Sequence, residues 1–219
     1  LEIAERSHDR RPPYTIKLIA FGAGEDGFTF PLVTPKRTAL SPDAYHQIVY
    51  LPYLVGARYH VLNRQEEVNR TIAVISLEAM GMGSPCIVRR DYYADSSPAL
   101  VGLIALNARL HGIRANVVDF MAASTPAGEQ AISHVYLPFS VAGVPSTFLV
   151  SMRDPSSGGV HSTVTEIPGY LSDRDTFSNL IEESGGREAL EGHMDAMADM
   201  VEYSIEAIFL VRGMWDLLQ

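Results

Sequence analysis

The densest group of side chains that could do chemistry is the run Arg89-Arg90-Asp91-Tyr92-Tyr93-Ala94-Asp95. It follows a predicted apolar strand and precedes a predicted helix that begins after Ser97. Guanidinium groups bind planar anions through paired hydrogen bonds, and tyrosine rings stack on planar or cationic groups. The run therefore predicts a binding site for an anionic or planar ligand, with Arg89, Arg90, Asp91 and Tyr92 as ligand-binding residues. The alternative is a solvated loop whose charges form local ion pairs.

A second candidate is the serine-rich segment Asp154 to Thr163, which contains His161. Glycine and serine are typical of loops, and loops at the ends of strands often carry function. We therefore add His161 to the predicted ligand-binding residues. The alternative is again an ordinary surface loop.

Signatures of catalysis or metal binding are absent from the sequence. There is no G-x-S-x-G elbow, and none of the seven histidines pairs with another at a spacing of four residues. The lone Cys86 excludes an internal disulfide and is flanked by apolar residues, so we expect a buried, inert thiol in a reducing, cytoplasmic compartment. Catalytic residues and cofactors stay unassigned, and no metal site is expected.

The elements that must position these groups begin with a predicted hairpin of two β-rich runs, 14–21 and 28–33, joined by a glycine-rich turn. Ser41-Pro42 predicts a helix start, and Pro52 should split or kink the helix that follows. Residues 64–80 are predicted to form another helix, with Val68, Ile72, Val74, Ile75 and Ala79 towards the core.

The second half of the chain predicts a helix over 99–111 after the cap Ser97-Pro98, and then a strand over 115–121. The remaining expected elements are a short helix from Thr125 to Ser133, strands at 135–139, 147–152 and 161–165, and helices at 173–183 and from 187 to the end. His134 to Met152 (HVYLPFSVAGVPSTFLVSM) loosely resembles the closing hairpin of some bacterial PAS-type sensor domains, which would imply a ligand-holding sheet.

Charge excludes one class of partner. The net charge is −9, and the second half of the chain carries the whole deficit. Because nucleic acid needs a basic face, no nucleic-acid binding is expected. Residues 130–152 contain no Asp, Glu, Lys or Arg, but Pro138 and Pro145 argue against a helix that spans a membrane.

The last segment carries the longest hydrophobic pattern. Apolar residues recur there every three or four positions, and acidic residues recur on the opposite face as far as Glu206. One interpretation is a helix that packs across its own domain. The other is an interface to a second subunit, with Met197, Val201, Ile205, Ile208 and Trp215 as interface residues.

Together these patterns predict an α+β fold with a mixed or antiparallel sheet, buried helices and a C-terminal helical subdomain that ends in a long helix. We expect a polar arm over 1–13, a core domain over 14–169 and a helical segment over 170–219. The expected function is a non-catalytic ligand- or partner-binding domain that self-associates, as a homo-oligomer, through its last helix; the acidic helix face could take a basic protein partner. The alternatives are a small-molecule enzyme that uses the Arg/Tyr loop with His161 or Cys86, and a structural assembly subunit.

Overall fold

The structure is a computed structural model that describes residues 15–21, 40–50, 54–78, 81, 83–91, 94–125, 128–130, 134–153, 160–162 and 176–217. For Tyr50 and for residues 121–125, 128–130, 160–162 and 212–217 it describes the backbone alone. The elements follow one another as α2 (Pro42–Tyr50), α3 (Val55–Asn63), α4 (Gln65–Asn69), β1 (Val74–Glu78), β2 (Ser84–Asp91), α5 (Pro98–Leu110), β3 (Asn116–Thr125), β4 (Gly128–Gln130), α6 (Leu137–Val141), β5 (Ser146–Met152), β6 (Val160–Ser162), α8 (Phe177–Glu183) and α9 (Arg187–Leu217).

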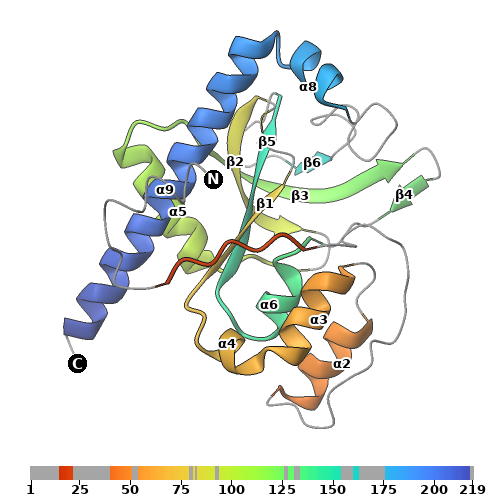
Figure 1. The fold of residues 1–219 in the computed structure, drawn as a ribbon, viewed down its shortest axis with the longest axis vertical. Coiled ribbons are helices and arrows are strands. Elements are labelled where there is room, and N and C mark those ends of the chain that lie inside the picture. Colours follow the sequence, from red (N-terminus) through yellow and green to blue (C-terminus); the bar gives the residue numbers. More distant parts are fainter. Residues whose placement is uncertain are drawn as a thin grey trace.

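A mixed sheet forms the centre of the molecule, in the order β1-β5-β2-β3-β4, with β6 also paired to β3 (Figure 1). β1 runs parallel to β5, and β2 and β6 run parallel to β3, whereas β2 is antiparallel to β5. The α+β class with a mixed sheet and a long C-terminal helix is therefore confirmed. Among the described helices, none has the length and apolar character that a membrane crossing requires.

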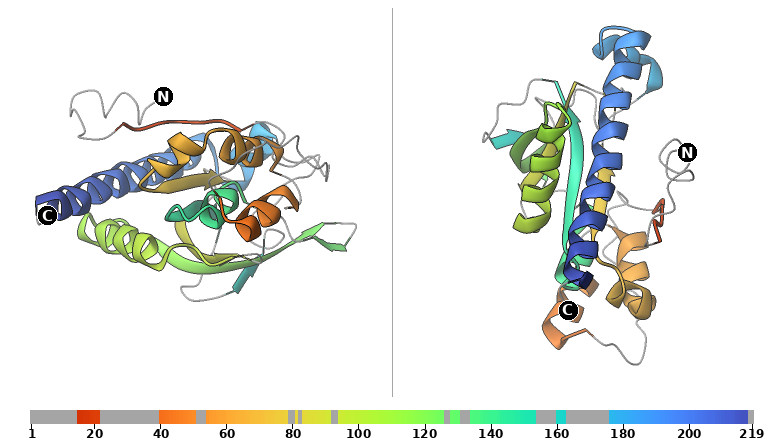
Figure 2. Two further views of the ribbon diagram at one scale, coloured as in Figure 1. Left: turned by 90° about the horizontal axis from the view of Figure 1, so that it is seen from below. Right: turned by 90° about the vertical axis from the view of Figure 1, so that its left-hand side faces the viewer.

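Two helices, α5 and α9, lie together on one side of the sheet (Figure 2). Ile87 of β2 and Leu149 of β5 face them and pack with Ile104, Met197 and Met200. The opposite face carries a second apolar group in which Val88, Phe120, Phe148 and Val150 surround Tyr136. The long helix α9 is thus part of the main core.

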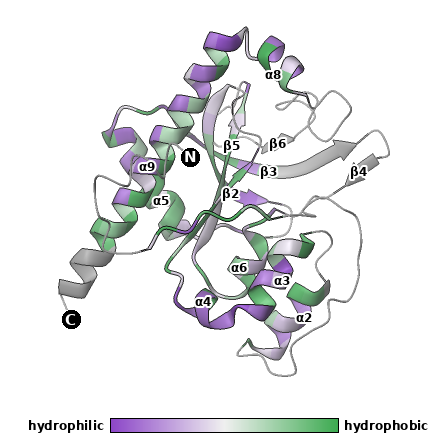
Figure 3. Ribbon diagram, in the orientation of Figure 1, coloured by the Kyte–Doolittle hydropathy of each residue, from purple (hydrophilic) through white to green (hydrophobic). Residues whose placement is uncertain are grey.

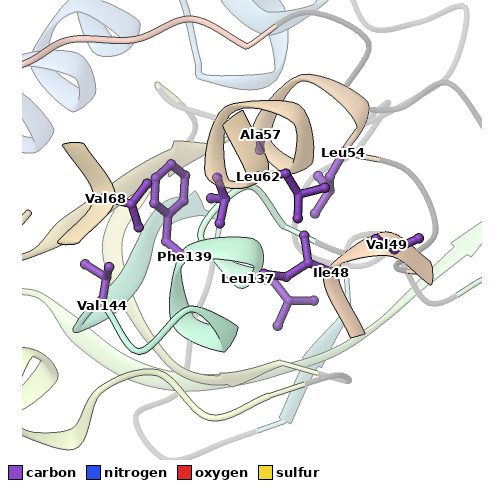
Figure 4. Packing of buried hydrophobic residues seen from close by; sticks show 10 residues of the cluster. Ile48, Val49, Leu54, Ala57, Leu62, Val68, Leu137, Phe139 and Val144 are labelled. Atoms are coloured by element: carbon purple, nitrogen blue, oxygen red, sulfur yellow. The ribbon is translucent and has the colours of Figure 1, made fainter. Parts of the chain in front are cut away.

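A third core joins α2, α3, α4 and α6 (Figure 4). Arg58 is fully buried there, and its guanidinium donates to the carbonyl oxygens of Ile48 and Val49. These carbonyls lie in the last turn of α2, where a helix has no backbone donors left for them. Arg58 therefore caps α2 from α3 and fixes the angle between the two helices.

Several predicted elements are confirmed. Ser41 and Ser97 each accept a hydrogen bond from the backbone N–H three residues on, as N-caps do, at the starts of α2 and α5. Two helices lie on either side of Pro52, since α2 ends at Tyr50 and α3 begins at Val55; Pro52 itself lies outside the described residues. The strands β3 and β5 and the helix α9 occupy the expected segments, and Gly112 follows α5 with a φ of 74°.

The helix predicted over 64–80 is wrong. α4 ends at Asn69, and residues 74–78 form β1. Val74 packs against the core around α3, whereas Ile75 packs against the core around α5 and α9. Consecutive side chains thus point to opposite sides, as they do in a strand, and the apparent helical spacing was accidental.

Three further predictions need correction. Residues 15–21 belong to no helix or strand, and residues 28–33 lie outside the described part, so the hairpin is not found. The helix expected after Thr125 is replaced by β4, which pairs with β3 through Thr125 and Gly128. The strand expected at 135–139 is a turn followed by α6, in whose first turn Pro138 is favourable because its missing N–H needs no partner there. The PAS-like hairpin therefore does not form.

Two boundaries also move. α8 begins after Thr176, whose hydroxyl accepts from the N–H of Asn179, and not at residue 173. β6 covers 160–162, so the small strand predicted at 161–165 starts one residue earlier. Its continuation lies outside the described residues.

Candidate functional site

The two arginines of the predicted loop both form ion pairs with carboxylates of this chain, one from β3 and one from the loop itself. Arg89 donates from Nε and Nη2 to the two carboxylate oxygens of Asp119, at 2.9 and 2.7 Å. Arg90 lies 3.3 Å from Asp95. The hydrogen bonds with Arg89 hold the pKa of Asp119 below its usual range. Arg90 and Asp95 thus form the local ion pair that the alternative for this loop expects, whereas Arg89 pairs with an acid from β3.

Asp91 differs from the two arginines because it is buried. A register shift between Val88 and Arg90 leaves both arginines exposed and turns Asp91 inward. One of its carboxylate oxygens accepts the backbone N–H of Ala94 at 2.8 Å, which closes the loop. Tyr92 lies outside the described residues.

The sheet brings His161 towards the same region. Asp91 is in register with Phe120 of β3, and Phe120 is in register with His161 of β6. These three strands are parallel, so their carboxyl ends lie at the same end of the sheet. Arg89, Arg90 and Asp91 are the last residues of β2, and His161 is the middle residue of β6. Carboxyl edges of parallel strands are common places for ligands.

A second polar group lies on the sheet face opposite α5 and α9, and the sequence reading missed it. Nδ1 of His134 lies 2.6 Å from Oε2 of Glu78, and Oε1 of Glu78 accepts the backbone N–H of Val135 at 3.3 Å. The His134 ring stacks on Phe148 with centroids 4.2 Å apart and meets the edge of Phe120 at 5.3 Å. His134 is 3% exposed, so a carboxylate–imidazole pair is enclosed here between aromatic rings.

Tyr136 extends this group towards the arginine loop. Its ring is fully buried and stacks on Phe148 with a centroid distance of 5.4 Å, and its hydroxyl donates to the carbonyl of Ala94 at 3.2 Å. Burial, with a contribution from the nearby carboxylate of Asp91, raises the pKa of Tyr136 well above its usual value. The phenol is therefore neutral and acts as a hydrogen-bond donor at any ordinary pH.

We call Glu78, His134, Tyr136, Phe148 and Asp91 the polar–aromatic cluster. A histidine that gives its Nδ1–H to a carboxylate presents Nε2 as an acceptor, which is the arrangement of many acid–base pairs. The same contacts also hold the turn at 134–136 against β1 and β5, so they have a structural role. Within the described residues, no three His, Cys, Asp or Glu side chains gather as a metal ion would require.

Sequence signals for this cluster were weak, because Glu78 and His134 are 56 positions apart. The one available signal was a lone histidine in a stretch, 130–152, without charged residues. A buried imidazole needs a hydrogen-bond partner, and the partner must then come from elsewhere in the chain.

Cys86 is fully buried in β2, and its thiol donates to the carbonyl of Ser84 at 3.4 Å. It lies in the apolar group around Phe148. The predicted burial of the thiol is therefore confirmed, and its inertness stays a prediction.

The predicted interface residues of α9 fall into three groups. Met197 and Val201 are buried in this chain's own core against α5 and β2, and Ile205 and Ile208 are partly buried against the same core. The backbone of Trp215 is helical, and its side chain is not among those described. The proximal half of α9 thus packs across its own domain, although Met194 there is 49% exposed. In the distal half two adjacent apolar side chains, Leu210 and Val211, are exposed.

In a comparison with models of known protein families and with curated proteins, neither a family model nor a curated sequence matched this chain.

Proposed function

We propose that the chain is a non-catalytic ligand- or partner-binding domain that self-associates through the distal part of α9. One observation carries the proposal: the apolar stripe of α9 continues beyond the part of the molecule that covers it. Met197, Val201, Ser204 and Ala207 on this stripe are each at most 5% exposed, but Val211 is 52% and its neighbour Leu210 68% exposed.

The position of the helix end explains why Leu210 and Val211 are exposed. The C-terminal end of α9 extends past α5 and the sheet (Figure 1). In the sequence the same three- and four-residue spacing goes on to Trp215 and Leu218. Large exposed apolar surface on a folded domain is typical of a contact with another protein. A second copy of the chain offers the same helix end and can cover it symmetrically.

The ligand half of the proposal is supported by neighbouring parallel strands, which bring Arg89 and His161 towards Asp91 of the polar–aromatic cluster. The sequence predicts a small anionic or planar ligand for that loop; since Arg89 and Arg90 pair with Asp119 and Asp95, we propose a small planar ligand. We place the domain in the cytoplasm because its lone cysteine fits a reducing compartment.

The test compares Leu210→Glu with Phe177→Glu by light scattering coupled to size exclusion. Phe177 is 63% exposed on α8 and is the matched control, since both substitutions place a carboxylate on an exposed apolar position of a helix. We expect Leu210→Glu to weaken self-association at least tenfold and Phe177→Glu to leave it unchanged. Equal masses for both variants and the parent chain would contradict the proposal, and an open-ended series of masses would indicate an assembly subunit instead.

A second candidate function, acid–base chemistry on a small molecule, is favoured by the 2.6 Å contact between Glu78 and His134. If that imidazole serves as a base, a small electrophile must reach it. Diethyl pyrocarbonate should then modify His134, and peptide mass analysis should find faster modification there than at exposed His111. Modification of His111 while His134 stays unmodified would contradict the hypothesis of acid–base catalysis.

A further inference from the structure

An exposed apolar strip runs along the outside of the helical layer. Leu106 and Leu110 of α5 are 58% and 73% exposed, and Leu210 of α9 is 68% exposed. Figure 3 shows hydrophobic residues along α5 and alternating hydrophobic and hydrophilic residues along α9. We call Leu106, Leu110 and Leu210 the leucine strip.

The leucines belong to one surface because of how α5 and α9 meet. Asn107 donates its side-chain amide to the carbonyl of Tyr203, and the His111 and Tyr203 rings stack with centroids 3.8 Å apart. At about 100° per residue, Leu106 and Leu110 lie on the outward side of α5 next to this seam. Leu210 is seven residues beyond Tyr203, so it lies on the same side of α9 as Tyr203. The strip therefore follows the outer edge of the seam.

The two helices run in opposite directions. α5 returns the chain from the end of β2 to the start of the parallel strand β3, so it runs against β2. α9 runs with β2: the N–H of Gly83, just before β2, donates to Nδ1 of His193, and Ile87 packs with Met197 and Met200 further on. Asn107 lies beside Tyr203. Because the helices are antiparallel and both rise about 1.5 Å per residue, Arg109, two residues after Asn107, lies level with about residue 201, two residues before Tyr203.

Opposite charges border the strip on its two sides. Arg109 is exposed on the α5 side, away from α9. On the α9 side the helical spacing places Asp199, Glu202 and Glu206 beyond Tyr203 and Leu210, and all three are partly exposed. Arg109 is thus at the height of Asp199 and Glu202 but on the other edge of the strip.

We propose that the leucine strip binds a second copy of this chain, related by a two-fold axis parallel to α5 and α9. The inference rests on the proposed self-association and adds the surface and its geometry. Rotation about such an axis leaves the position of each residue along the helix direction unchanged. It places the α5 side of the strip of one copy over the α9 side of the other, so Arg109 of each copy faces the acidic residues of its partner. An in-plane axis perpendicular to the helices would put the acids of one copy on the acids of the other, and repulsion between these like charges makes that arrangement unfavourable.

The first experiment replaces the α5 part of the strip and measures mass by light scattering over a concentration series. The double variant Leu106→Gln and Leu110→Gln should raise the dissociation constant at least tenfold. Tyr59→Gln with Phe177→Gln is the matched control, since these residues are 57% and 63% exposed elsewhere on the surface. Because all these side chains are exposed, the variants should keep the parent's circular dichroism spectrum.

The second experiment reverses charges and does not depend on the leucines. Arg109→Glu alone should weaken association about tenfold by placing like charges together, and addition of Glu202→Arg with Asp199→Arg should restore it. Failure of this restoration would overturn the two-fold arrangement.

The outcomes separate the two proposals. If Leu210→Glu dissociates the oligomer and the Leu106/Leu110 variant does not, this inference is wrong and self-association through α9 stands. If the unmodified chain is a monomer at all concentrations, both are wrong.

Discussion

At the scale of single residues, the Glu78–His134 pair links the end of β1 to the turn before α6. Hydrogen bonds to a charged group typically contribute about 1.5–3 kcal/mol, and more is lost when one buried partner is left alone. We predict a coupling free energy of about 2 kcal/mol in a double-mutant cycle of Glu78→Gln and His134→Gln, measured by urea unfolding. The exposed pair Arg187–Glu191 on α9 is the control, with an expected coupling of about 0.3 kcal/mol. Equal coupling free energies in the two cycles would contradict the claim that Glu78 and His134 form an enclosed pair.

The Arg89–Asp119 pair predicts a pH dependence. The pKa of Asp119 is lowered by Arg89 in the folded chain, so the pair stabilises the fold above the unfolded pKa, about 4, and this contribution is lost as the pH falls through the lower folded value. Asp119→Asn should therefore cost about 0.5–1 kcal/mol at pH 7, since Arg89 is half exposed, and progressively less below about pH 4.

Urea unfolding at pH 7, 5 and 3 checks this dependence. Asp95→Asn is the control because the Arg90–Asp95 pair is largely exposed, so it should change stability little at any of these pH values. A cost of Asp119→Asn that stays constant down to pH 3 would contradict the assignment.

At the scale of elements, the approach of β2 to β5 depends on Gly83. Its φ is 76°, and a Cβ placed there would lie 2.1 Å from the carbonyl oxygen of Met152. Gly143 has a similar φ of 87° but open space around it, which makes it a matched control. We predict that Gly143→Ala costs about 1 kcal/mol from the backbone conformation alone.

Gly83→Ala should cost clearly more than its control, because backbone in the pair Ser84–Met152 must move as well. Thermal unfolding of both variants measures the difference. Similar melting temperatures would show that β2 does not need this close approach.

How far the sequence predicts this fold differs between elements. Capped starts such as Ser97-Pro98 and the long stripe of α9 were predicted correctly, because their signals are local. β1 was taken for a helix because its place between two cores is set by pairing with β5. α6 was taken for a strand because five residues are too few for periodicity to separate the two.

The candidate site was also predictable only where its pattern is local in the sequence. The arginine run is a local pattern, so the sequence found it, but its partner Asp119 comes from β3 and turns the expected anion clamp into an ion pair. The Glu78–His134 contact joins distant segments and has no local pattern at all.

At the scale of the whole molecule, α9 connects the core to the proposed interface. Its first half is held by the His193–Gly83 hydrogen bond and by Met197 and Met200 in the core. Its acidic residues lie on the side away from the core. Its apolar residues continue past Ala207, the last buried position, to the exposed Leu210 and Val211. Burial of Leu210 and its neighbours by a second copy would remove this exposed surface from water, at about 25 cal/mol per Å² of apolar area.

The most direct measurement of the central claim is the native mass of the purified, unmodified chain over a range of concentrations. We predict a species of twice 24.0 kDa that gives way to the single chain on dilution. A mass of 24.0 kDa at every concentration would contradict the account and would leave the exposed end of α9 without a role in self-association.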